Sequence, residues 1–141
     1  MDALQGAVLD VKLRYLDRWT EARGRLANRY RQLLSGQPIQ LPEVGFDRRH
    51  VWHLYVALHP ERDRIRTELE AAGIHTGLHY PIPLHLQKAY QHLGGRAGDY
   101  PVAEKIANEC FTLPLFAEMT TQQQDAVVDA LNNVLHEVAW S

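Results

Sequence analysis

The sequence predicts an α+β fold: a long leading helix followed by a small three-stranded, mostly antiparallel sheet covered by helices. Apolar residues recur every three or four positions over the first 34 residues, and three later segments are short, apolar and strand-like, two of them with alternating hydrophobicity. Prolines and glycines separate these segments. The 141 residues, 45% of them hydrophobic and 23% charged, are ordinary for one globular domain, which excludes a disordered or fibrous chain.

The leading helix is expected to run from about Asp2 to Leu34. Unbroken, it would be roughly 50 Å long, whereas a domain of this size has a radius of gyration of about 14 Å. The helix must therefore bend, break near Gly24, or project and bury its apolar stripe against a partner. We expect a homo-oligomer formed through this helix. The stripe comprises Leu4, Val8, Val11, Tyr15, Trp19, Ala22, Leu26, Tyr30 and Leu33.

Residues 36–141 are expected to form an α+β unit behind the leading helix, residues 1–35. Trp52, Leu54, Val56 and Leu58 should share one side of the first strand, and Val51, His53, Tyr55 and Ala57 the other. Prolines open two of the expected helices, and Thr120-x-x-Gln123 is a capping-box pattern that opens the last. The expected strands are Val51–Leu58, Ile74–Leu78 and Cys110–Leu113, and the expected helices begin near Pro60, Leu86, Pro101 and Thr120.

Charge and composition exclude several classes of protein. The formal net charge is −2, and although residues 1–35 hold seven basic against four acidic residues, the two signs are interleaved, so we expect no nucleic-acid partner. No apolar run approaches the roughly 18–20 residues of a membrane span, and we expect no signal peptide. A lone cysteine, Cys110, cannot form an internal disulfide and suits a reducing, cytoplasmic location.

The residues that could carry chemistry form no complete catalytic set. His75, His79 and His85 could ligate zinc, but no carboxylate lies at a ligand-like spacing among them, so we favour polar contacts or a small-ligand pocket over a metal site. Cys110 is expected in the core. The other nucleophile candidates, Ser35, Ser141, Lys12, Lys88 and Lys105, lie at chain or helix ends or on amphipathic helices. We predict no catalytic, cofactor-binding or metal-binding residue.

The segment from His79 to Gln87, which we call the lip, reads His-Tyr-Pro-Ile-Pro-Leu-His-Leu-Gln. It alternates hydrogen-bonding side chains, which offer donors and acceptors, with prolines that reduce the entropy lost on ordering. Such a segment suits a polyhydroxylated ligand such as a sugar. The alternative is a structural loop with exposed imidazoles.

Four stretches together resemble the C-terminal portion of the DegT/DnrJ-like, pyridoxal-phosphate-dependent nucleotide-sugar aminotransferases. They are Met1–Ala7, His53–Val56, Gly77–Gln87, and Gly98–Glu104 followed by Leu113–Leu115. The resemblance implies the small α+β domain of a fold-type I aminotransferase. It also implies that His79, Tyr80 and His85, and more weakly Gln87, lie on the substrate side of the sugar-nucleotide pocket.

The family's pyridoxal-phosphate lysine lies in a large domain that has no counterpart in these residues. The resemblance therefore implies a part of a transaminase that contributes the substrate-side lip and dimer contacts, inactive as this chain alone and with no cofactor bound to it. The alternative is a stand-alone binding or interaction module derived from the same domain. The sugar nucleotide and amino donor are not indicated by the sequence.

Overall fold

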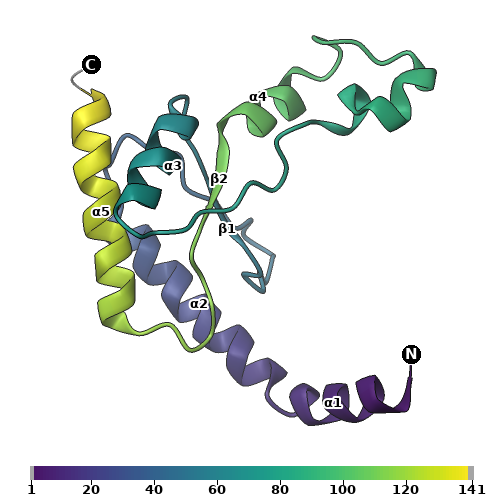
Figure 1. The fold of residues 1–141 in the computed structure, drawn as a ribbon. Coiled ribbons are helices and arrows are strands. Elements are labelled where there is room, and N and C mark those ends of the chain that lie inside the picture. The colour runs from purple at the N-terminus through teal and green to yellow at the C-terminus, as the bar shows by residue number, and fades with distance from the viewer. Residues whose placement is uncertain (1, 140–141) are drawn as a thin grey trace.

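The computed structural model describes residues 2–139. Met1 of the first motif, Ser141, and the side chain of Val138, an apolar residue of the last expected helix, lie outside this description. The fold is α+β, as predicted (Figure 1). In chain order its elements are α1 (Ala3–Leu13), α2 (Leu16–Leu33), β1 (Tyr55–Leu58), α3 (Arg62–Ala71), the 3₁₀ helices η1 (Leu84–Leu86) and η2 (Lys88–Leu93), α4 (Pro101–Glu109), β2 (Cys110–Leu113) and α5 (Thr121–Ala139).

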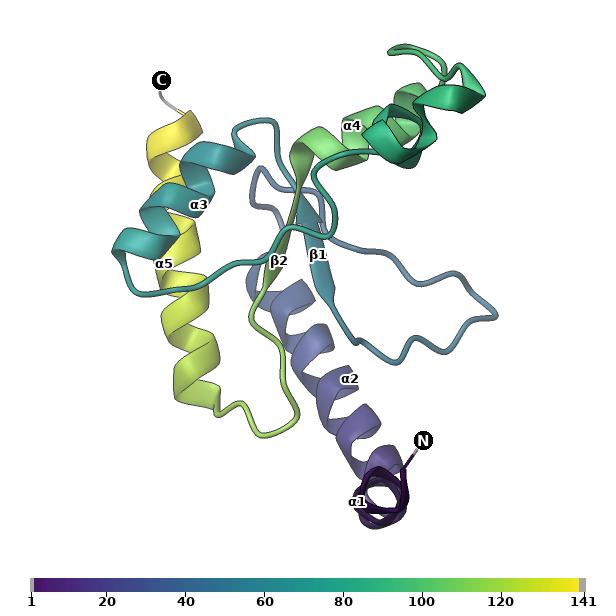
Figure 2. The ribbon, with the colours of Figure 1, turned by 45° about the vertical axis from the view of Figure 1, so that its right-hand side comes forward.

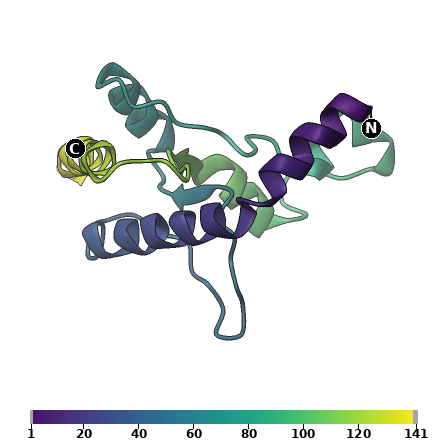
Figure 3. The same ribbon diagram turned by 90° about the horizontal axis from the view of Figure 1, so that it is seen from below.

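The leading segment forms two helices instead of the single helix expected. The break falls at Arg14 and Tyr15, where the amide of Arg14 donates to the carbonyl oxygen of Lys12. It does not fall at Gly24, which lies inside α2. No residue of α1 is buried, while α2 buries Ala27 and Tyr30. Seen from below, α1 turns away from the line of α2 (Figure 3). Of the two helices, only α2 therefore contributes buried residues to the fold.

Within the described residues the sheet has two antiparallel strands, not three. Tyr55 of β1 pairs with Leu113 of β2, and Leu58 pairs with Cys110. The expected strand over residues 74–78 is reduced to one bridge, in which Gly77 and Thr112 exchange both backbone hydrogen bonds at 3.2 and 2.9 Å. At the start of the expected strand, the amide of Ile74 donates to the carbonyl oxygen of Leu69 in α3 at 2.8 Å, so it is not available to the sheet.

The side assignment predicted for the first strand is wrong at Trp52. Its φ of +54° turns the backbone, and the regular strand begins only at Tyr55. Trp52 therefore shares a face with Tyr55, and their rings stack with centroids 5.6 Å apart. Arg23 of α2 supports this turn by donating to the carbonyl oxygens of Trp52 and Leu115 at 3.4 and 2.9 Å.

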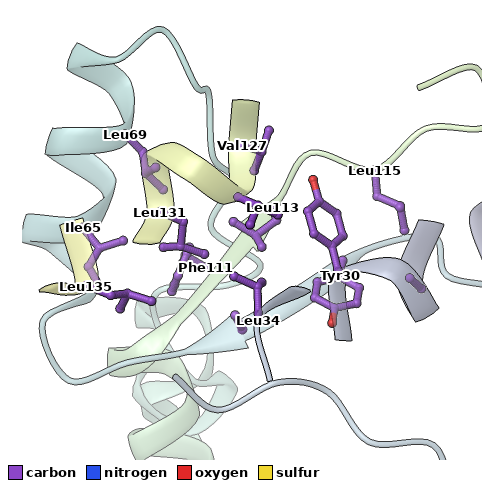
Figure 4. Packing of buried hydrophobic residues seen from close by; sticks show 14 of the residues in the cluster. Tyr30, Leu34, Ile65, Leu69, Phe111, Leu113, Leu115, Val127, Leu131 and Leu135 are labelled. Atoms are coloured by element: carbon purple, nitrogen blue, oxygen red, sulfur yellow. The ribbon is translucent and has the colours of Figure 1, made fainter. Parts of the chain in front are cut away.

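The core lies where α2, α3 and α5 gather around the two strands (Figure 4). Burying each large apolar side chain contributes roughly 1.5–3 kcal/mol. Cys110 is fully buried beside this core, as expected. The cluster contains Tyr30, Leu34, Tyr55, Ile65, Leu69, Phe111, Leu113, Val127, Leu131 and Leu135 among others.

Several local signals produced the expected elements. The capping box forms at Thr120, whose Oγ1 accepts from the amide of Gln123 at 3.2 Å while Gln123 Oε1 accepts from the amide of Thr120 at 2.9 Å. Pro101 begins α4, and Gly73, with φ of +77°, follows the end of α3. The helix expected near Leu86–Leu93 is replaced by η1 and η2.

Residues 78–100, which we call the arm, contain η1 and η2 and extend away from α2, α3 and α5 (Figures 1 and 2). None of these residues is buried. The arm begins beside β2 at the Gly77–Thr112 bridge and returns through α4, which runs directly into β2. Both of its ends are therefore anchored at the same strand.

No helix within residues 2–139 combines the length and the apolar character needed to cross a bilayer.

Candidate substrate-binding lip

The lip opens with His79, which is exposed but held at one ring nitrogen. Its Nδ1 lies 2.9 Å from Oγ1 of Thr112, a buried residue of β2. Gly77 makes this placement possible: a Cβ atom at that position would lie 2.5 Å from Cε1 of His79. The ring of Tyr80 meets that of His79 edge-on, with centroids 5.6 Å apart.

The second histidine of the lip, His85, is nearly enclosed. Its side chain is 11% exposed, and its Nε2 lies 3.0 Å from Oε1 of Glu104 in α4. The ring of Tyr100 packs on it with centroids 4.8 Å apart. Gly95 allows the close approach, because a Cβ there would lie 2.9 Å from the His85 carbonyl oxygen. The lip is thereby joined to α4 at the far end of the arm.

Glu104 is the centre of this contact. Both of its carboxylate oxygens accept from the amide of Gly98, at 2.9 and 3.0 Å, and Oε1 also accepts from the amide of Tyr100 at 3.3 Å. Desolvation raises the pKa of Glu104, but the two amides and His85 together outweigh it and hold that pKa below its usual value. The glycine-rich stretch around Gly98 is thus a turn that binds a carboxylate of its own chain.

A hollow of about 760 Å³ lies between the lip and α4. Tyr80, His85 and Gln87 line it, so three of the four predicted site residues come together, while His79 is not among its lining residues. Gln87 is tied to the lip itself, since its Nε2 donates to the Ile82 carbonyl at 3.4 Å. The other walls are mostly apolar: Ile82, Pro83, Leu84, Tyr90, Leu93, Tyr100, Ala103, Ile106 and Ala107. The hollow combines apolar walls with a few polar groups, as small-ligand sites do.

Sequence reasoning missed Glu104 and Tyr100 as members of the site. Glu104 is nineteen residues from its partner His85, and nothing in local spacing pairs them. The available signal was the Gly98–Glu104 motif, in which a carboxylate follows Pro101 in the first turn of a helix. A carboxylate there can accept from the free amides that precede the helix.

The zinc alternative finds no geometric support. Across residues 2–139, no three histidine, cysteine or carboxylate side chains gather where they could hold an ion. The three histidines have different partners: His75 contacts Glu70 at 2.9 Å, His79 contacts Thr112, and His85 contacts Glu104.

A second hollow, of about 520 Å³, lies between α1, α2 and the turn at residues 51–53. Trp19 and Arg23 line it together with Lys12, His53 and Glu118. The Arg23 guanidinium donates to the backbone carbonyl oxygens of Trp52, His53 and Leu115. The positive charge of Lys12 and the negative charge of Glu118 also line this hollow.

The described residues thus form an α+β layer that carries a histidine-rich lip beside a mostly apolar hollow. The chain belongs to the DegT/DnrJ/EryC1/StrS aminotransferase family, whose profile matches residues 1–132. The pleiotropic regulatory protein of Geobacillus stearothermophilus is 41% identical over 134 residues, covering 93% of this chain and 36% of that protein. The dTDP-3-amino-3,4,6-trideoxy-α-D-glucose transaminase of Streptomyces venezuelae is 39% identical over 132 residues, covering 93% and 35%.

Solved structures agree with these similarities. S. venezuelae DesV, crystallised in complex with a ketimine intermediate, superposes with a TM-score of 0.93 at 38% identity, covering 96% of this chain and 37% of that one. A DegT DnrJ EryC1 StrS aminotransferase from Brucella abortus gives a TM-score of 0.87 at 33% identity, covering 94% and 35%. The chain thus spans little more than a third of the relatives it matches, in agreement with the C-terminal portion indicated by its motifs.

The described residues do not fit the anchoring site of a pyridoxal-phosphate cofactor. Such a site needs a lysine that a desolvated pocket or a cationic neighbour activates toward Schiff-base formation. Lys12, Lys88 and Lys105 are all exposed to solvent. No step of cofactor chemistry is therefore assigned to this chain.

Proposed function

We propose that this chain is the C-terminal part of a pyridoxal-phosphate-dependent aminotransferase that transfers an amino group to a keto-sugar nucleotide. The observation that carries the proposal is the hollow under the lip, where Tyr80, His85 and Gln87 converge from one short segment. In this proposal the chain binds and orients the sugar nucleotide, His79 also faces the substrate, and the reaction takes place in the cytoplasm.

The composition of the hollow supports a sugar ligand. Hydroxyl groups need both donors and acceptors, which phenol, imidazole and amide side chains provide. The apolar faces of a pyranose ring need flat apolar surface, and the rings of Tyr80, Tyr90 and Tyr100 line the hollow. His85 is held by Glu104, so the site is partly ordered before any ligand binds.

The cofactor supplies the electron sink of the reaction when it is bound, and the exposure of all three lysines supports a separate anchoring lysine. We therefore propose that the chain alone binds no pyridoxal phosphate and catalyses no transfer. Borohydride reduction of the isolated chain with pyridoxal phosphate should label no single lysine at near-stoichiometric yield.

The apolar surface of α1 supports association with further protein. Leu4, Val8 and Val11 are 76%, 49% and 54% exposed, and α1 buries none of its residues. Covering such surface contributes about 25 cal/mol per Å². We propose that α1 packs across a subunit interface of a homodimer.

The same surface favours a second candidate, a stand-alone binding module that docks a partner protein through α1. The two candidates differ in what the lip does. A binding module leaves the hollow under the lip unused, whereas the transferase needs it for the sugar nucleotide.

A domain replacement tests the transferase. Residues 1–141 would replace the matching third of the S. venezuelae transaminase, and the chimera would be assayed with that enzyme's own nucleotide sugar. We expect amino transfer that depends on pyridoxal phosphate, and no transfer by the isolated chain. A chimera that folds and binds the cofactor, shown by its visible absorbance, yet transfers no amino group would contradict the proposal.

A further inference from the structure

We propose that Glu104 is a positioning residue of the substrate lip, which holds His85 in a single tautomer and leaves Nδ1 as the ring nitrogen available to a ligand hydroxyl. The proposal rests on the proposed function for the identity of the ligand. The contacts of Glu104 and His85 that support the proposal are all between described residues.

The environment of the pair distinguishes it from an ordinary surface contact. His85 and Glu104 have side chains 11% and 20% exposed, with 3.0 Å between Nε2 and Oε1. The chain also contains a solvent-exposed pair of the same chemistry, His75 and Glu70, 2.9 Å apart with side chains 81% and 59% exposed. Water competes with the exposed pair, while the enclosed pair is shielded.

The carboxylate is fixed independently of the histidine. The amides of Gly98 and Tyr100 donate to it, and these backbone groups belong to the loop that precedes α4. The ring of Tyr100 and the backbone at Gly95 then confine His85 on other sides. Glu104 is therefore held in place before it meets the ring, as a positioning group requires.

The chemistry of the contact determines the tautomer. An ionised carboxylate only accepts hydrogen bonds, so the neutral imidazole of His85 must carry its proton on Nε2. Nδ1 then has a lone pair, and within residues 2–139 it takes part in no hydrogen bond. A sugar hydroxyl that donates to Nδ1 would give both ring nitrogens of His85 a hydrogen-bond partner.

Nitrogen-15 NMR of the histidine rings in the 141-residue chain tests the assignment without any enzyme assay. We expect the neutral ring of His85 to show a protonated Nε2 and an unprotonated Nδ1. Glu104→Gln keeps an acceptor oxygen and should keep this tautomer, whereas Glu104→Ala should give a mixture of the two forms. Glu70→Ala is the matched control and should leave the His85 signals unchanged.

Two results would overturn the proposal. One is a protonated Nδ1 in the unsubstituted chain, a measurement that does not depend on whether a variant folds. The other is a Glu104→Ala chain whose core amide signals are intact and whose His85 tautomer is unchanged.

The chimera separates this proposal from the proposed function. In an active chimera, Glu104→Ala should raise KM for the nucleotide sugar about tenfold, the loss of one hydrogen bond, and leave the visible absorbance of the bound cofactor unchanged. Glu70→Ala should alter neither. An unchanged KM would contradict the role of Glu104, whereas an inactive chimera with the expected NMR tautomer would contradict only the transferase.

Discussion

The imidazole of His79 occupies the space that a side chain at position 77 would need, since a Cβ atom on Gly77 would lie 2.5 Å from Cε1 of that ring. The same glycine pairs with Thr112, whose hydroxyl contacts Nδ1 of His79. The start of the lip, its first histidine and the edge of β2 are therefore interdependent.

Gly77→Ala should displace the ring of His79 and break its contact with Thr112. Because His79 is exposed, its ring can move aside, so the expected loss is that of one hydrogen bond, about 0.5–1.5 kcal/mol of the free energy of unfolding. Urea denaturation of the chain measures this loss, and the His79 ring signals should shift with it.

Gly24→Ala is the control, because it should raise the free energy of unfolding instead of lowering it. Gly24 lies inside α2 and a Cβ there would meet nothing within 4 Å. Alanine in a helix interior is more stable than glycine by about 0.5–1 kcal/mol. A loss of stability at this position would contradict the continuous α2 helix.

Two buried tyrosines of the core should respond differently to loss of the hydroxyl. Tyr30 donates to the carbonyl oxygen of Pro114 at 2.9 Å. Tyr30→Phe should therefore lower the free energy of unfolding by about 1 kcal/mol. The hydroxyl of Tyr55 is buried without a partner, so Tyr55→Phe should be neutral or stabilising. Thermal denaturation of the two single variants compares them directly, and equal losses would contradict the assignment.

The same tyrosines should make the fold sensitive to alkali. Burial raises the pKa of Tyr55 to about 12, and it also raises the pKa of Tyr30 from the ordinary 10.0. The folded state then keeps protons that the unfolded state loses, so the free energy of unfolding should fall as the pH rises from about 10 toward 12. Urea midpoints at several alkaline pH values measure this slope.

The double variant Tyr30→Phe, Tyr55→Phe is the control for the alkaline slope. It has neither titrating hydroxyl, so its urea midpoint should fall less over the same pH range. An equal fall in both proteins would show that other groups cause it.

The exposed stripe of α1 should control oligomeric state. Val8→Glu places a charge on the stripe and should convert a dimer to a monomer in size-exclusion chromatography with light scattering. Leu13→Glu is the matched control, because Leu13 is also apolar and 67% exposed but does not belong to the stripe. A dimer that survives Val8→Glu, or an unsubstituted chain that is monomeric, would contradict the interface.

Local signals allowed much of the fold to be predicted. The ends of three helices depend only on residues next to them in the sequence: Pro101, the Thr120–Gln123 capping box and Gly73. Accordingly, α3, α4 and α5 form close to the expected positions. The break at Arg14 has no such signal, because no glycine or proline is present there and helical periodicity continues across it.

The remaining differences come from tertiary contacts. The one-residue bridge at Gly77 and the turn at Trp52 depend on which partners surround them, and alternation in the sequence carries no information about that. At the candidate site, the residue types of the lip and the family resemblance predicted His79, Tyr80, His85 and Gln87, and three of these, without His79, line the hollow. The contact between His85 and Glu104 was not predicted, because it requires the arm to fold back on α4.

The anchoring of the arm at both ends has an evolutionary consequence. Residues 78–100 leave the sheet beside β2 and rejoin it through α4, and none of them belongs to the buried core. A contiguous stretch with these properties can be exchanged at a small cost in stability, since the buried core of the fold lies outside it and, among the described residues, only the hydrogen bond of His79 with Thr112 ties its side chains to β2. Under the function proposed above, we expect exchange of the arm to change ligand preference, provided that Glu104 of α4, which lies outside the arm, is kept.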